Sequence, residues 1–142
     1  MINKDLIHNR LDLINRSIAR LKRMAALTRK QFLADPDNFA IAEHHLRRAL
    51  ESLFDAGRHI MAKQGLGHPV DYRSIILTLG REKIIPLQFT EKIKGMAGYR
   101  NRLVHGYAEV TPEEMYNIMQ KRPADFEEFC SYILKYIAKH GV

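Results

Sequence analysis

Apolar residues recur at spacings of three, four and seven between Asp5 and Ala34. Because an α-helix turns once in about 3.6 residues, this spacing places them in one narrow stripe along a helix. The stripe is interrupted only at Thr28 and consists of Ile7, Leu11, Ile14, Ile18, Leu21, Ala25 and Phe32. Such a stripe favours side-by-side packing of near-parallel helices, within one chain or across a dimer. The pattern therefore predicts one long helix over residues 5–34, packed in a helical bundle.

Prolines and glycines divide the rest of the chain into further helices. Asp35 and Pro36 suit the N-cap and first position of a second helix, which continues through Ile60. We expect a third helix over 72–81, a fourth from about 89 to 105 and a fifth that begins at 112. A last helix should follow Pro123. The helix from 112 should begin with a capping box made by Thr111 and a glutamate. Nothing predicts a sheet, so residues 1–142 should form a single all-α domain, an up-and-down bundle of about five or six helices.

Length and composition agree with one folded domain. The 142 residues are 46% hydrophobic and 27% charged, which provides enough apolar material for a core and argues against disorder. Cys130 is the only cysteine and cannot form an internal disulfide, and no apolar run has the length of a signal peptide or membrane span. We therefore expect a cytoplasmic protein without membrane contact.

The net charge limits the choice of partners. Lysine and arginine exceed the acidic residues by enough to give a net charge of +7 and a pI of about 9.7. This charge favours a polyanionic partner such as nucleic acid, although it also serves simple solubility.

The segment GMAGYRNRLVHGYAEV, from Gly95 to Val110, interrupts an apolar helical pattern with basic and polar residues. Its core side is expected to consist of Ile93, Met96, Ala97, Leu103 and Val104. Arg100 and His105 lie near the edge of that side and roughly 140° apart on a regular helix. They could meet only if the helix unwinds, for which Gly106 offers the place. The alternative is that these cations merely complement the negative end of the helix dipole.

The string RNRLVHGY resembles the signature of the HEPN superfamily, specifically of its HepT-like toxins. Arg100, Asn101, His105 and Tyr107 match that motif without a gap. The resemblance extends to the helical hairpin, to SLFDAGRHIMA in the second helix, to the Pro-Val-Asp-Tyr segment and to the long final helix. It therefore covers almost the whole chain.

This resemblance implies a metal-independent ribonuclease toxin that acts as a homodimer. It also implies a type VII-like toxin–antitoxin pair, in which a minimal nucleotidyltransferase (MNT) antitoxin transfers AMP from ATP to Tyr107. No metal or cofactor is expected.

The residue chemistry agrees with RNA cleavage. Without a metal, the ribose 2′-hydroxyl must lose a proton, the phosphorane must be stabilised and the leaving 5′-oxygen must gain a proton. His105 can exchange protons at neutral pH, and Arg100 can hold two phosphate oxygens. Because one chain offers a single such histidine, a dimer would supply the second group.

Other polar residues have weaker claims. Asn101 could orient His105 or the phosphate, or simply bond at the helix end. Asp55 and His59 lie one turn apart and could support the catalytic histidine, or form an ordinary surface pair. His44 and His45 lack further ligands at a spacing that metal sites use.

Two other functions remain open. One is a non-catalytic helical module that binds a nucleotide or presents substrate to a nucleotidyltransferase. The other is a structural dimerisation domain, which a buried and fully hydrogen-bonded motif would favour.

Overall fold

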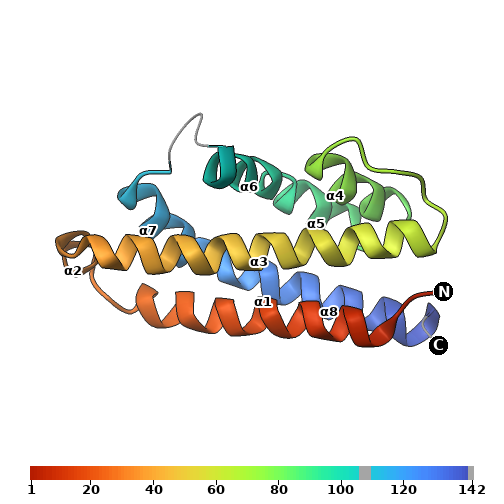
Figure 1. The fold of residues 1–142 in the computed structure, drawn as a ribbon, viewed down its shortest axis with the longest axis horizontal. Coiled ribbons are helices and arrows are strands. Elements are labelled where there is room, and N and C mark those ends of the chain that lie inside the picture. The colour runs from red at the N-terminus through yellow and green to blue at the C-terminus, as the bar shows by residue number, and fades with distance from the viewer. Residues whose placement is uncertain (106–109, 141–142) are drawn as a thin grey trace.

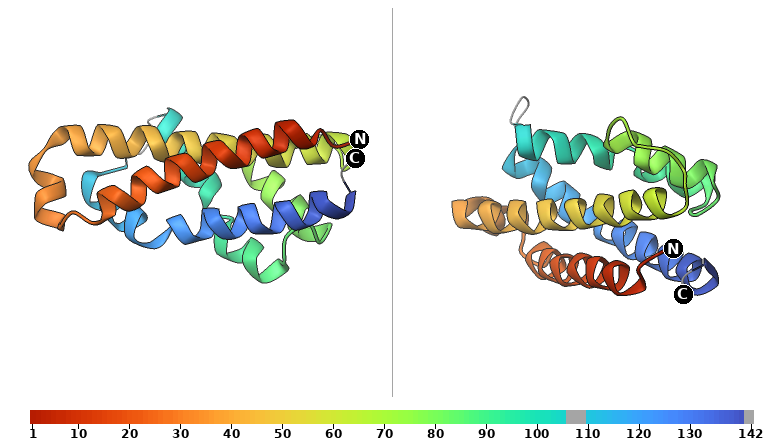
Figure 2. Two further views of the ribbon diagram at one scale, coloured as in Figure 1. Left: turned by 90° about the horizontal axis from the view of Figure 1, so that it is seen from below. Right: turned by 45° about the vertical axis from the view of Figure 1, so that its right-hand side comes forward.

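A long central helix organises the molecule. The computed structural model describes residues 1–105 and 110–140, with the side chain of His105 outside the described part. Helix α1 (Lys4–Ala25) and α3 (Pro36–Lys63) run antiparallel, and α8 (Pro123–His140) lies beside α1 (Figure 1). The shorter helices α4 (Tyr72–Arg81), α5 (Leu87–Ile93) and α6 (Met96–His105) cover the opposite side of α3 (Figures 1 and 2). The N-terminus and the C-terminal end of α8 lie at the same end of the bundle (Figures 1 and 2).

The all-α prediction is confirmed, and the described residues contain eight helices. The prediction of five or six fell short because two predicted helices are each divided in two. The predicted helix over 5–34 is wrong as a single element: α1 ends at Ala25 and α2 (Arg29–Ala34) begins after Thr28. Thr28 is extended and forms a capping box with Gln31, which starts a new helix inside the apolar periodicity.

The helix predicted from about 89 to 105 is divided at Lys94 and Gly95. The carbonyl of Gly95 accepts hydrogen bonds from the N–H groups of Gly98 and Tyr99, at 3.0 and 3.4 Å, and thereby begins α6. Helices α3 and α4 begin after Asp35 and Asp71, whose side chains cap them. Helix α7 (Pro112–Lys121) begins after Thr111.

The core follows the apolar stripe of α1. The five buried apolar residues that α1 contributes are Ile7, Leu11, Ile14, Ile18 and Leu21. They face α3 and α8, where Leu50, Leu53 and Phe129 are also buried. Cys130 lies in the same core, and burial raises the pKa of its thiol to about 12, so this cysteine is unreactive at neutral pH. No helix in residues 1–105 and 110–140 has both the length and the apolar character needed to span a membrane.

Candidate active site

Helix α6 presents the motif on the outer side of the bundle. Met96 and Ala97 are buried at its beginning, and Leu103 packs partly against the core. We expected Val104 on the core side of the helix, and this prediction is wrong, because 42% of its surface is exposed. The second half of α6 therefore lies less deeply than the first, with Arg100 partly exposed and Asn101 exposed.

Arg100 is half-buried against an aromatic ring. Its Cζ lies 4.2 Å from the centroid of the Tyr72 ring, a cation–π distance. Its Nε is buried without a hydrogen-bond partner. Among the described residues, no acidic side chain forms an ion pair with Arg100. The ring positions the guanidinium, and no carboxylate of residues 1–105 and 110–140 neutralises it.

Helices α3 and α4 hold Tyr72 in place. Asp71 caps α4 through a capping box with Ser74, so Tyr72 is the first residue of a well-defined helix. Its ring packs edge-on against Phe54, with 5.0 Å between centroids and 61° between planes. A Cβ on Gly57 would lie 2.6 Å from Ile75, so glycine is what allows α4 to approach α3 this closely.

Arg58 of α3 brings a second guanidinium to the same ring, with its Cζ 5.6 Å from the centroid. Arg58 also forms an ion pair with Asp55 at 3.4 Å. A small cavity of about 190 Å³ lies beside it, lined by Arg58, Tyr72 and residues 69–71. Two arginines from different helices thus share one aromatic surface.

Arg102 has a different role from Arg100. Its two terminal nitrogens donate to both carboxylate oxygens of Glu114, at 2.6 and 2.7 Å. This pairing raises the pKa of Arg102 and joins α6 to α7. Glu114 therefore completes only half of the predicted capping box: its N–H donates to Thr111, but its carboxylate bonds to Arg102.

Asp55 and His59 bond to the N-terminal segment. Asp55 forms an ion pair with Arg10 at 3.5 Å, and Nε2 of His59 accepts a hydrogen bond from the N–H of Asn3 at 3.0 Å. Burial, followed by the charge of Lys63, lowers the pKa of His59. These partners belong to the fold, and a supporting role of either residue at the active site stays a prediction.

Of the remaining motif residues, the structure describes Asn101 and the backbone of His105. Asn101 is exposed on α6, and α6 stays helical through His105. Unwinding is therefore absent from the described backbone up to His105. Gly106 and Tyr107 lie outside the described residues.

Metal ligands do not gather in the described part of the chain, where no group of three His, Cys, Asp or Glu side chains could hold an ion. The rings of His44 and His45 contact each other at 5.0 Å. Burial lowers the pKa of His45, and the charges of His44 and Arg20 add to this effect.

Comparison with known proteins defines the family. A model described as "Ribonuclease HepT-like" matches residues 14–133, so this chain belongs to the HepT-like family of ribonucleases. It is 30% identical over 132 residues to an "mRNA nuclease HepT" of Shewanella oneidensis, covering 91% of this chain and 96% of that protein. It is 26% identical over 133 residues to a "tRNA nuclease HepT" of Aphanizomenon flos-aquae, covering 91% of this chain and 90% of that protein.

A solved structure shares the whole fold. The tri-AMPylated HEPN toxin of Shewanella oneidensis, in complex with an MNT antitoxin, superposes with a TM-score of 0.84 and 29% identity. The match covers 94% of this chain and 99% of that one. The predicted family, fold and enzyme class are confirmed.

Sequence reasoning overlooked Tyr72 and Arg58 as neighbours of Arg100. Both lie in segments through which the chain resembles its family, SLFDAGRHIMA and Pro-Val-Asp-Tyr. A signal was therefore present, but nothing in the sequence indicated that the two segments meet at α6.

Proposed function

We propose that this protein is a metal-independent endoribonuclease toxin that cleaves RNA by attack of the 2′-hydroxyl. The observation that carries the proposal is Arg100: a half-buried guanidinium, oriented by Tyr72, with no acidic partner in the described residues. It stands five positions before His105 in a member of a ribonuclease family. A structural arginine would be expected to carry a carboxylate partner, as Arg102 does.

Arg100 binds the scissile phosphate and stabilises the charge of the phosphorane, because its planar guanidinium donates to two oxygens at once. His105 transfers the proton from the 2′-hydroxyl, or to the 5′-oxygen that leaves. Asn101, exposed on the same helix, orients the phosphate or the imidazole. Asp55 would support the site through its ion pair with Arg58, and His59 would do so only through α3.

The working site is a homodimer. Residues five apart on a regular helix project about 140° from each other, so one chain does not present Arg100 and His105 side by side. A second copy of α6 across a cleft supplies the missing acid or base. The net charge of +7 attracts the RNA to this cleft.

Neutralisation is by AMP transfer to Tyr107, in a type VII-like toxin–antitoxin pair in the cytoplasm. The phenol oxygen attacks the α-phosphorus of ATP, pyrophosphate leaves and the phenol proton is lost to solvent. The similar toxin of Shewanella oneidensis is tri-AMPylated and bound to an MNT antitoxin, which supports the same partner here. An adenylyl group near Arg100 would compete with RNA for the guanidinium.

The test of catalysis is cleavage of labelled RNA in EDTA by the wild type, Arg100→Ala and His105→Ala. We expect the wild type to cleave and His105→Ala to lose about 10²- to 10⁴-fold in rate. Arg16→Ala removes an exposed arginine on α1 and is the matched control, which should cleave like the wild type. Near wild-type cleavage by His105→Ala, or a requirement for added magnesium, would contradict the mechanism.

The test of neutralisation is intact-mass and peptide mass spectrometry after co-expression with the cognate antitoxin. We expect one or more AMP units on Tyr107 and none on Tyr107→Phe. Full neutralisation with an unmodified Tyr107 would favour inhibition by complex formation alone.

A further inference from the structure

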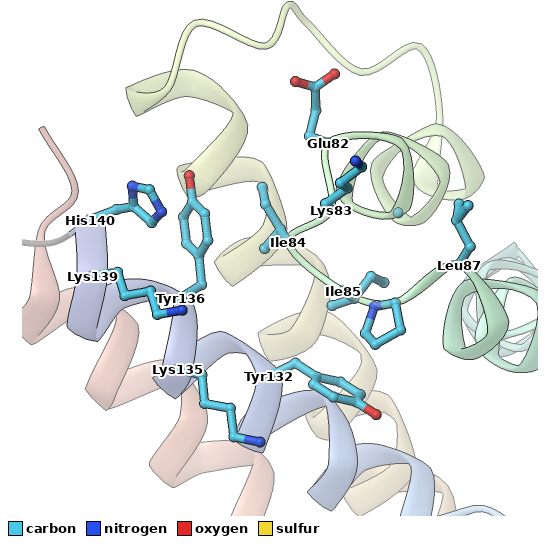
Figure 3. Close-up of a pocket in the computed structure, with 12 residues that line it drawn as sticks. Glu82, Lys83, Ile84, Ile85, Leu87, Tyr132, Lys135, Tyr136, Lys139 and His140 are labelled. Carbon is cyan, nitrogen blue, oxygen red and sulfur yellow. The ribbon is translucent and has the colours of Figure 1, made fainter.

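A second cavity lies away from Arg100, between the C-terminal half of α8 and the connection from α4 to α5. Its volume is about 530 Å³, and Figure 3 shows the side chains around it. Ile84 and Ile85 line one wall, and Tyr132 and Tyr136 rise from α8 on the other side. We call this cavity the α8 groove.

Three lysines surround the α8 groove, and the Nζ of one of them, Lys135, lies 6.0 Å from the centroid of the Tyr132 ring. Lys83 lines it from the connection, and Lys135 and Lys139 line it from α8. Among the residues that the structure describes, none of the three forms an ion pair with an acidic side chain. The acid at its rim, Glu82, is already engaged by Arg81 at 3.6 Å. The groove is therefore positively charged and suited to an anion.

Aromatic rings are held in place beside these lysines. The hydroxyl of Tyr132 donates to Glu128 at 3.0 Å, and the hydroxyl of Tyr136 accepts from Gln64 at 2.7 Å. The Tyr136 ring stacks on His140, with 4.3 Å between centroids and 25° between planes. The hydroxyl proton of Tyr132 is used within the protein, whereas that of Tyr136 remains available to a ligand, so the two tyrosines offer ring surface and Tyr136 also offers a hydrogen-bond donor.

The connection that forms the opposite wall is closely packed and hydrogen-bonded to the end of α4. A Cβ on Gly80 would collide with Thr90, so α4 and α5 meet closely there. Lys83 has a φ of 61°, a left-handed conformation that glycine adopts more readily than lysine. The N–H groups of Ile84 and Ile85 both donate to the carbonyl of Leu79, at 2.9 and 3.3 Å. A lysine thus stands where the backbone favours glycine, and it lines the groove.

We propose that the α8 groove anchors single-stranded RNA, with phosphates on the three lysines and bases against the tyrosine rings and the apolar wall. Single-stranded RNA is bound by this combination of a basic groove and aromatic surfaces. The inference rests on the proposed ribonuclease function and adds a second contact with the same substrate. The two sites lie at opposite ends of α4, since Tyr72 begins this helix and Gly80 lies near its end. Ten helical residues span about 15 Å, a distance that a short RNA strand can bridge.

The first experiment measures binding of a labelled, unstructured RNA to the full chain carrying His105→Ala, so that cleavage does not interfere. On this background, Lys135→Gln with Lys139→Gln should weaken binding at least tenfold. The slope of log affinity against log salt should fall by roughly 1.4, since each phosphate contact with a single strand contributes about 0.7. The control pair Lys30→Gln with Lys121→Gln removes the same charge from exposed sites on α2 and α7 and should change neither quantity.

Two further variants separate the groove from folding and from general charge. Lys83→Gly removes a charge and suits the left-handed backbone, so it should bind RNA more weakly while its Tm does not fall. Tyr136→Leu keeps the net charge but loses the ring, and binding should weaken about fivefold or more.

Equal affinities and salt slopes for the groove pair and the control pair would overturn the inference. Loss of antitoxin binding by the groove pair, with its RNA binding intact, would overturn it as well. Failure of the wild type to cleave RNA would instead contradict the proposed function, which the binding measurements do not test.

Discussion

Two arginines on α6 have contrasting surroundings, one at the proposed site and one in the fold. Arg100 contacts the Tyr72 ring and has no acidic partner in the described residues, whereas Arg102 donates to both oxygens of Glu114. On a helix, residues two apart project about 200° from each other, so the two guanidiniums face different surroundings. Arg102 satisfies its charge within the protein and fixes α7 to α6. Arg100 is positioned by a neutral ring instead, and in the proposed mechanism its charge binds the phosphate.

The same division applies to the histidines. His59 accepts a hydrogen bond from the backbone of Asn3, and this bond requires the neutral imidazole. The proposed role of His105 requires a histidine that can both gain and lose a proton. Residue type alone therefore does not identify a catalytic group in this chain, and the partners of each residue decide between the two roles.

The largest expected effect is that of Arg100→Ala on catalysis. Removing the donor that stabilises the phosphorane should lower the cleavage rate by about 10²- to 10³-fold. The Tm should stay close to that of the wild type, because no ion pair of the described residues is lost. Cleavage assays and thermal unfolding of the same preparation check both parts. A large fall in Tm would show that Arg100 is structural.

Arg102→Met should show the opposite pattern. The paired side chains are each 32% exposed, so the loss of this bidentate ion pair should cost only about 1 kcal/mol of the free energy of unfolding. For a chain of this size the Tm should fall by roughly 3 °C. Unfolding and cleavage measured well below the Tm check this expectation. A loss of cleavage as large as that of Arg100→Ala, with Tm unchanged, would contradict the division between the two arginines.

The smallest expected effect is a pH dependence caused by His59. Burial lowers the pKa of His59 in the folded protein. In the unfolded chain its pKa is the ordinary value of about 6.5, so as the pH falls below this value the unfolded chain binds more protons than the folded protein. Its contribution to stability is therefore complete above about pH 6.5 and is lost as the pH falls. We expect His59→Gln to reduce the loss of stability between pH 7.5 and 5.5 by less than about 1 kcal/mol. Denaturant unfolding at both pH values measures this difference, and an unchanged loss would show that His59 does not contribute.

Local signals predicted much of the fold. Asp35 with Pro36, and Thr111 with Pro112, mark the beginnings of α3 and α7 because capping depends on neighbouring residues. The division after Ala25 was missed because the apolar periodicity continues across Thr28, although Thr28 and Gln31 form a capping box. Periodicity describes which residues face the core and does not require a continuous helix.

The site could be predicted only in part. The motif predicted Arg100 as a site residue, which stays a prediction, but its contact with Tyr72 joins two helices, and the spacing of residues within one helix does not predict such a pairing. Glu114 was expected to complete a capping box, and instead Arg102 binds its carboxylate. A local bond and a tertiary ion pair compete for the same group here, and only the folded structure decides between them.

The most direct test of the central claim is the chemistry of the cleaved ends. A defined RNA and the same RNA with 2′-O-methyl groups are incubated with the wild type in EDTA, and the products are analysed by mass spectrometry. We predict that only the unmodified RNA is cleaved and that its products carry a 2′,3′-cyclic phosphate, or the monophosphate formed by its hydrolysis. Cleavage of the methylated RNA, or products with a 3′-hydroxyl and a 5′-phosphate, would contradict attack by the 2′-hydroxyl.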